Sequence, residues 1–183
     1  MKCPSCGTET LNYAYLDDAL PCKACDSCQG NWLLLEDYLR WKELYSEKLK
    51  DVGDIDIELT ETKRALICPV SGTLMLKYRI SKDTSHRLDL SSAVNGIWLD
   101  KGEWILLKKS GLAGKLNAIF TAPWQRQIRS ESSAETFEQL YCEKFGNEDY
   151  NKVKAFRSWL VNHPNADALK AFIVADDPWS AVR

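Results

Sequence analysis

Five of the seven cysteines of this 183-residue chain lie within its first 28 residues, and their spacing is typical of a metal site. Two Cys-x-x-Cys pairs, Cys3 with Cys6 and Cys25 with Cys28, are separated by 18 residues. Two intervening residues let a tight turn aim both sulfurs at one point, and Gly7 and Gly30 supply permissive backbone after each turn. Four thiolates in a tetrahedral shell favour Zn²⁺ or iron, of which we expect zinc, and they leave no open position for a catalytic water. The sequence therefore predicts one structural zinc ion per chain, held by Cys3, Cys6, Cys25 and Cys28.

Cys22 leaves an alternative open, because Cys22 and Cys25 also form a Cys-x-x-Cys pair. Cys22 could replace Cys25 as a ligand, but we interpret it as a small buried residue on the strand between the two pairs. A thioredoxin-like redox pair would need a βαβ context that this sequence lacks. A zinc-sensing or redox switch through Cys22 beside Cys25 is a further hypothesis.

Part of the cysteine motif recurs later in the chain. Residues 94–99 (VNGIWL) resemble residues 28–33 (CQGNWL), and residues 68–72 (CPVSG) resemble residues 3–7 (CPSCG). The four ligand positions of the second copy are occupied by Cys68, Ser71, Ser91 and Val94. A hydroxyl is a poor zinc ligand and a valine is none, so we expect the second copy to bind no metal.

The second copy must then be held together by packing. Apolar residues alternate with polar ones from Leu74 to Ile80 and again at Leu88 and Leu90, which predicts a half-buried hairpin. His86 lies between these stretches, and we interpret it as a solvated loop residue. Trp32 lies near the end of the first copy of the motif and Trp98 near the end of the second. We expect both side chains to be anchors of the hydrophobic core.

These motifs resemble a known family, the bacterial "transcription factor zinc-finger" family, which is a TFIIB-like zinc ribbon. The resemblance runs from Cys3 to about Tyr38, and again through residues 95–103 of the second copy, so that it covers roughly the first 105 residues. It implies zinc binding and a ribbon fold. It implies little about biochemical activity, because a fold does not fix a function.

The elements that must position these residues form an α+β chain. We expect two small zinc-ribbon-like units of a β-hairpin and helix, the second without metal, followed by a C-terminal helical domain. The expected boundaries are 1–50, a linker at 51–65, the degenerate ribbon with its helices at 66–122, and the helical domain at 130–183. Apolar spacing predicts helices at 32–50, 102–109 and 112–120. Three more helices are predicted, the first capped at Ser132 and stopped at Gly146, the second from Asn147 and the third from Pro164.

Composition excludes several classes of protein. The net charge of −2 argues against a chain that coats nucleic acid by bulk positive charge. No apolar run approaches the roughly 20 residues of a membrane span, and Met1 is not followed by an apolar signal segment, so we expect a cytoplasmic protein without membrane contact. Phosphate loops, nucleophile elbows and zinc-protease motifs are absent, so we expect neither an enzyme nor a small-molecule substrate.

The leading functional hypothesis is a zinc-binding, non-catalytic module that contacts a protein partner, in transcription or in another macromolecular assembly. The alternative is a nucleic-acid-binding regulator, because residues 67–129 carry 10 basic and 4 acidic side chains, a net charge of +6. Its candidate residues lie within segment 98–129 and are Lys101, Lys108, Lys109, Lys115, Arg126 and Arg129. A simpler interpretation is that these basic side chains face solvent or pair with the acidic first or last third of the chain.

Overall fold

The computed structural model describes residues 1–7, 10–17, 19–45 and 58–179. Residues 51–57 of the predicted linker and the predicted last turn of the first helix lie outside the described residues. The chain divides into two compact units, Met1–Glu131 and Ser132–Arg183. No helix in the described part of the chain is both long enough and apolar enough to cross a membrane.

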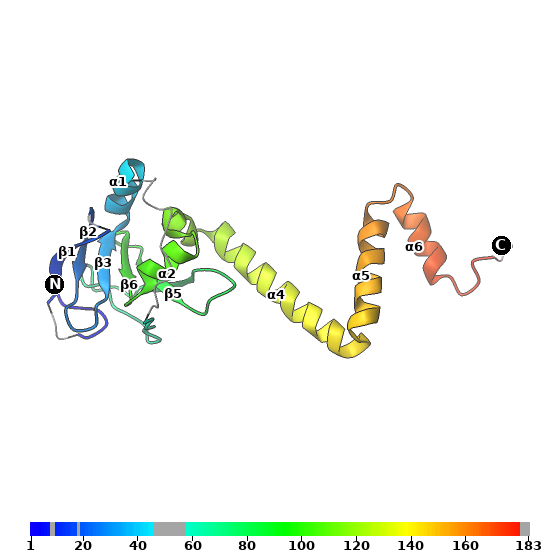
Figure 1. Ribbon diagram of the computed structural model, residues 1–183, viewed down its shortest axis with the longest axis horizontal. Helices are drawn as coiled ribbons and strands as arrows, with labels where there is room; N and C mark the ends of the chain where they lie inside the picture. The colour runs from blue at the N-terminus through cyan, green and yellow to red at the C-terminus, as the bar shows by residue number, and fades with distance from the viewer. Residues whose placement is uncertain (8–9, 18, 46–57, 180–183) are drawn as a thin grey trace. The chain divides into compact units, whose positions relative to one another are not determined.

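The first unit is built on one antiparallel sheet of six strands in the order β1-β2-β3-β6-β5-β4 (Figure 1). The strands are β1 (Asn12–Leu16), β2 (Leu20–Ala24), β3 (Asn31–Leu34), β4 (Leu76–Arg79), β5 (Arg87–Ser91) and β6 (Gly96–Leu99). The hairpins β1–β2 and β4–β5 correspond to the two predicted ribbons. The expected pair of small units is instead one continuous sheet, because β3 pairs with β6 along their whole length.

The pairing of β3 with β6 is centred on two tryptophans. Trp32 lies opposite Trp98, and Leu34 lies opposite Gly96. A Cβ atom on Gly30 would overlap the indole ring of Trp98, and one on Gly96 would overlap the ring of Trp32. Glycine is therefore required at both positions for close approach of a side chain from the other strand.

The hydrophobic core forms two clusters. The larger one joins the sheet to the helices α1 (Leu35–Tyr45), α2 (Glu103–Lys109), η2 (Ala113–Lys115) and α3 (Leu116–Ile119). In it the Tyr38 hydroxyl donates a hydrogen bond to the Ala113 carbonyl (2.7 Å) and accepts one from the Leu116 amide (3.2 Å). The smaller cluster contains Cys3, Cys25, Cys68 and both tryptophans, of which Trp98 is 0% exposed. The prediction that Trp32 and Trp98 are core anchors is confirmed.

Three helices continue the chain: α4 (Ala122–Phe145), α5 (Asn147–Val161) and α6 (Ala166–Val174). The predicted helix start at Ser132 is wrong, because α4 runs without a break from Ala122. Its first turn is anchored to the sheet unit, since the Trp124 indole N–H donates to the Ile80 carbonyl (3.0 Å) and the Gln125 amide to the Arg79 carbonyl (2.8 Å). Gly146, with φ of 82°, separates α4 from α5 at the predicted stop.

Candidate metal centre

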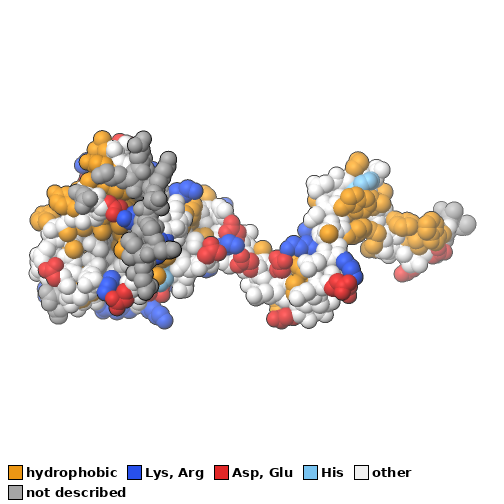
Figure 2. Space-filling model, viewed as in Figure 1, with side chains coloured by type: hydrophobic (Ala, Val, Ile, Leu, Met, Phe, Trp, Pro, Cys, Tyr) orange, Lys and Arg blue, Asp and Glu red, His pale blue; other side chains and the backbone are white. Residues whose placement is uncertain are grey.

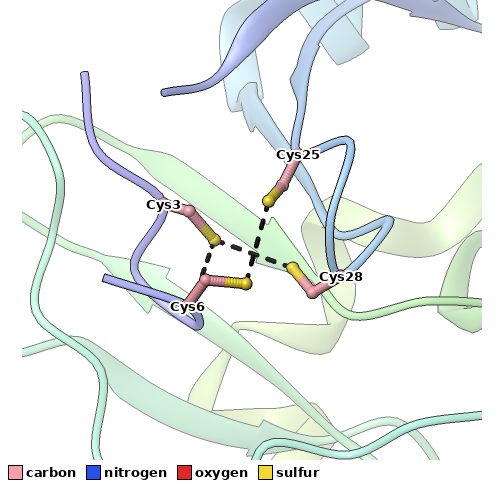
Figure 3. Close-up of side chains that lie close together, drawn as sticks. All are labelled: Cys3, Cys6, Cys25 and Cys28. Carbon is pink, nitrogen blue, oxygen red and sulfur yellow. Dashed lines mark hydrogen bonds between the residues drawn. The ribbon is translucent and has the colours of Figure 1, made fainter. Parts of the chain in front are cut away.

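The sulfur atoms of Cys3, Cys6, Cys25 and Cys28 all lie within 4.8 Å of one another (Figure 3). The Cys3 and Cys28 sulfurs are 3.6 Å apart, and the Cys6 and Cys25 sulfurs are 3.9 Å apart. Sulfurs bound at about 2.3 Å in a tetrahedron around zinc lie about 3.8 Å from one another. Among the described residues this is the one group of three or more His, Cys, Asp or Glu side chains that could hold a metal ion.

Local hydrogen bonds shape the two turns that present the sulfurs. The Gly7 amide donates to the Cys3 carbonyl (2.8 Å), and the Gln29 amide donates to the Cys25 carbonyl (2.8 Å). Gly7 has a φ of 79°, as expected of a permissive residue, but in the second turn Gln29 takes the left-handed conformation with φ of 59°. We expected Gly30 to supply the permissive backbone conformation after this turn. The structure shows a different requirement at Gly30, which is space for the Trp98 ring.

Burial and hydrogen bonding shift the pKa values of three of the four thiols in different directions. Burial raises the pKa of Cys3 and of Cys28. Burial also opposes ionisation of Cys25, but hydrogen bonds from the backbone N–H groups of Cys28 and Ser27, together with those from neighbouring thiols, outweigh it and lower the pKa of Cys25. Cysteine ligands of zinc are thiolates, and a bound divalent cation would supply the charge that stabilises them at a site where Cys3 and Cys25 are buried.

Cys22 lies apart from the four sulfurs. It sits on β2 opposite Ala14, and its thiol contacts the Asn31 side-chain oxygen at 3.7 Å. Burial raises the pKa of Cys22 to about 11. A neutral thiol packed in the larger core cluster agrees with the interpretation of Cys22 as a small buried residue rather than a ligand.

In the second copy, the turn that follows Cys68 resembles the turn that follows Cys3, although Cys68 is the one cysteine at the four ligand positions of that copy. The amides of Val70 and Ser71 donate to the Cys68 sulfur at 3.4 and 3.3 Å, and the Gly72 amide donates to the Cys68 carbonyl at 3.0 Å. Burial disfavours the Cys68 thiolate, but several hydrogen bonds, of which the largest contributions come from the Ser71 side chain and backbone, together outweigh burial and lower the pKa of Cys68. In the equivalent turn of the first copy, the Gly7 amide donates the corresponding hydrogen bond to the Cys3 carbonyl.

His86 is not the solvated loop residue that we expected. Its side chain is 16% exposed, and its Nδ1 atom lies 3.6 Å from a carboxylate oxygen of the buried Glu103. Burial raises the pKa of Glu103 well above its usual value. Local sequence did not reveal this contact, because Glu103 lies 17 residues further along the chain, at the start of α2.

A polar network that sequence reasoning missed connects the first zinc turn to the end of β6. The Ser5 and Thr62 hydroxyls are 3.0 Å apart, and Thr62 donates to the Asp100 carboxylate at 2.9 Å. The same carboxylate oxygen accepts the Trp98 indole N–H at 2.8 Å. Arg64 donates to the carbonyl groups of Pro4 and Ser5. Thr62 and Arg64, near the end of the predicted linker, therefore contact and help to position the first zinc turn.

The six basic residues of the nucleic-acid hypothesis do not form one free patch. Lys108 pairs with Asp17 at 2.6 Å, and Lys101 pairs with Glu58 at 2.5 Å. Both acidic partners come from the first third of the chain, as the simpler interpretation proposed. The remaining four basic side chains are exposed and are Lys109, Lys115, Arg126 and Arg129.

Comparison with known proteins supports the metal centre. Residues 2–44 match the family described as "Transcription factor zinc-finger", a TFIIB-like zinc ribbon. No curated protein and no solved structure matches the chain. The matched residues include all four clustered cysteines, the first three strands and most of α1. The N-terminal region is therefore zinc-ribbon-like, with a four-cysteine site for one Zn²⁺ ion.

Proposed function

We propose that this protein is a zinc-stabilised, non-catalytic module that acts by binding a protein partner in a transcription-related assembly. Its zinc site supports a structural role, because four cysteine sulfurs complete a tetrahedral shell and leave no position for water or substrate. The family match at residues 2–44 supports the link to transcription.

The single observation that carries the proposal is the exposed apolar surface of the helical unit. Among residues 132–179, Leu160 is the one buried hydrophobic residue. Twelve large hydrophobic side chains of this segment are exposed, namely Phe137, Leu140, Tyr141, Phe145, Val153, Phe156, Trp159, Val161, Phe172, Ile173, Val174 and Trp179. Figure 2 shows hydrophobic side chains gathered over this part of the chain. Apolar patches of this kind mark interaction surfaces.

Co-purification of the zinc-loaded full chain from nuclease-treated extract of its source cells tests the proposal. We expect a protein recovered in stoichiometric amount with the wild type and lost with the double variant Phe156→Asp/Trp159→Asp. The matched control is Leu44→Asp, which changes an exposed leucine of α1 in the other unit and leaves recovery unchanged. Absence of any stoichiometric protein would reject the proposal.

Nucleic-acid binding is the second candidate, favoured by the exposure of Lys109, Lys115, Arg126 and Arg129. It predicts an affinity that falls with salt in proportion to the number of phosphate contacts. Arg126→Glu/Arg129→Glu should then weaken binding by at least about tenfold and reduce the salt slope by about two. Lys152→Glu, at a lysine that pairs with Glu148 on α5, is the control. Equal binding by both variants would exclude this candidate.

A further inference from the structure

Two buried polar atoms face each other at the start of α2. The His86 Nδ1 atom and the Glu103 Oε1 atom are 3.6 Å apart, and neither has a hydrogen-bond partner among the described residues. Glu103 is 1% exposed, and its other carboxylate oxygen accepts the Asp100 amide at 2.8 Å. Buried polar atoms in proteins are nearly always paired. A side-chain shift of less than about 1 Å brings the two atoms to hydrogen-bond distance, so each is the natural partner of the other.

A hydrogen bond between these atoms needs one proton. An ionised carboxylate and the bare nitrogen of a neutral imidazole are both acceptors, so they bind each other only when one of them is protonated. If the imidazole carries the proton, two opposite charges are buried together. If the carboxyl group carries it, neither group is charged, and the cost of burying a charge is avoided.

The surroundings of Glu103 favour the neutral carboxylic acid. Burial is the largest effect and raises the pKa of Glu103 well above its usual value, and the carboxylates of Asp100 and Asp89 raise it further. The Asp100 amide and the Lys77 ammonium act in the opposite direction. Lys77 is already engaged, because its ammonium lies 2.7 Å from the Asp89 carboxylate and 2.7 Å from the Thr62 carbonyl oxygen. These groups belong to β4, β5 and the end of β6, which surround the start of α2.

The pair connects a loop to a helix. His86 is the last residue of the loop 80–86, which joins β4 to β5, whereas Glu103 is the first residue of α2. The Thr84 hydroxyl accepts the His86 amide at 3.2 Å, so the backbone of His86 is held by the loop itself while its side chain reaches the helix. Residues 81–84 also line a cavity of about 430 Å³ together with side chains of α2 and of the first turns of α4. The position of the loop therefore sets the shape of this cavity.

We propose that Glu103 is a neutral carboxylic acid that donates its proton to His86 Nδ1, and that this hydrogen bond holds the β4–β5 loop against α2 until a rising pH removes the proton. Loss of the proton leaves two acceptors facing each other and adds a negative charge beside Asp89 and Asp100. A carboxyl group with a raised pKa stabilises the fold below its unfolded pKa, and this stabilisation is lost as the pH rises through its folded pKa. The inference is independent of the proposed function, since it concerns the first unit and needs no partner.

Nuclear magnetic resonance of the isotope-labelled, full-length, zinc-loaded protein locates the proton. The chain has two histidines, so in His163→Gln every imidazole signal comes from His86. At about pH 7, where an ordinary glutamate is ionised, we expect an unprotonated Nδ1 and a Glu103 carboxyl carbon with the shift of the protonated acid. The carboxyl signal is assigned through the backbone signals of Glu103, so neither member of the pair is changed. A proton on Nδ1, or an ionised Glu103, would overturn the proposal.

Hydrogen exchange of the loop amides measures the release. Glu103→Gln is the test variant, because its side-chain amide can donate to Nδ1 and has no proton to lose as the pH rises. We expect equal exchange rates in this variant and the wild type at about pH 7, and exchange at least about tenfold faster in the wild type at alkaline pH. Comparison at each pH removes the intrinsic pH dependence of exchange.

The matched control is Asp83→Asn, which removes an exposed acid from the same loop and should follow the wild type. Circular dichroism checks that each variant is folded. Equal rates for the wild type and Glu103→Gln at every pH would overturn the release of the loop, and faster exchange in Asp83→Asn than in the wild type at about pH 7 would show that another acid holds it.

Discussion

Trp32 and Trp98 lie directly opposite each other at the centre of the β3–β6 pair, and each ring occupies the space beside a glycine of the other motif. The Trp98 ring lies against Gly30 and the Trp32 ring against Gly96. This exchange joins β3 to β6, and with them the two halves of the first unit, into one sheet, although Trp32 and Trp98 are 66 positions apart in the sequence. These four residues set the close approach of the two strands at the centre of the β3–β6 pair.

Substitution of Gly96 by alanine should destabilise the first unit by about 1–3 kcal/mol, because the added methyl group overlaps the Trp32 ring in a close-packed core. Chemical denaturation monitored by tryptophan fluorescence measures the free energy of unfolding. The control is a double-mutant cycle with Trp32→Leu. If the cost of Gly96→Ala is the same with leucine as with tryptophan at position 32, the overlap is not its cause.

Loss of one ligand should release the zinc. We expect Cys25→Ser to lower the metal content from one zinc per chain to none and to remove a stabilisation on the order of 10 kcal/mol from the ribbon. Metal analysis by mass spectrometry after gel filtration provides the measurement. Cys22→Ser is the matched control, because its sulfur is outside the cluster, and it should keep one zinc. Zinc lost from Cys22→Ser but kept by Cys25→Ser would reverse the assignment.

Asp100 should control how firmly the first zinc turn is held. Asp100→Ala leaves the buried Trp98 N–H and the Thr62 hydroxyl without their acceptor, at a cost of about 1–3 kcal/mol for each unsatisfied group. Because Thr62 contacts Ser5 between the ligands Cys3 and Cys6, we also expect faster zinc transfer to a chromogenic chelator. Glu36→Ala, at an exposed acid of α1, should leave the transfer rate unchanged.

The stability of the first unit should depend on the pH through Asp89. Burial raises the pKa of Asp89 to about 6, although the Lys77 ammonium at 2.7 Å acts in the opposite direction. The folded protein keeps this proton to a higher pH than the unfolded chain does, so the free energy of unfolding falls as the pH rises from about 4 to about 7. Asp89→Asn removes this ionisation and should therefore gain stability relative to the wild type as the pH rises.

Urea denaturation at several pH values measures this difference. The zinc ligands contribute their own pH dependence, which the comparison of Asp89→Asn with the wild type at each pH removes. Asp83→Asn, at an exposed acid near the β4–β5 turn, should follow the wild type. A constant difference between Asp89→Asn and the wild type across the range would contradict the prediction.

The zinc ligands could be read from the sequence because their geometry is local. Two residues between cysteines fix each turn, and the turn aims both sulfurs at one point whatever surrounds it. The hairpin β4–β5 was predictable for a similar reason, since the alternation of apolar and polar residues sets the buried face of each strand, whereas β1–β2 was expected from the ribbon resemblance. Gly146 likewise marked the boundary between α4 and α5 by its backbone conformation.

The start of α4 was not predictable from the capping signal at Ser132. Contacts of Trp124 and Gln125 with the carbonyl groups of Ile80 and Arg79 begin the helix ten residues earlier. Once the helix has started, continuing it gains one hydrogen bond for each residue added, and a serine in its interior is not enough to stop it. Tertiary contacts therefore override the local preference.

The sequence by itself determined the identity of the four ligands, the local hairpins and the approximate positions of most helices. Only the tertiary structure decided that Trp32 faces Trp98, that position 30 must be glycine to leave space for the Trp98 ring, and that His86 lies beside the buried Glu103. These relationships join residues far apart in the chain. They depend on which surfaces fit together when side chains pack at close to crystal density, and no local pattern of residue types carries that information.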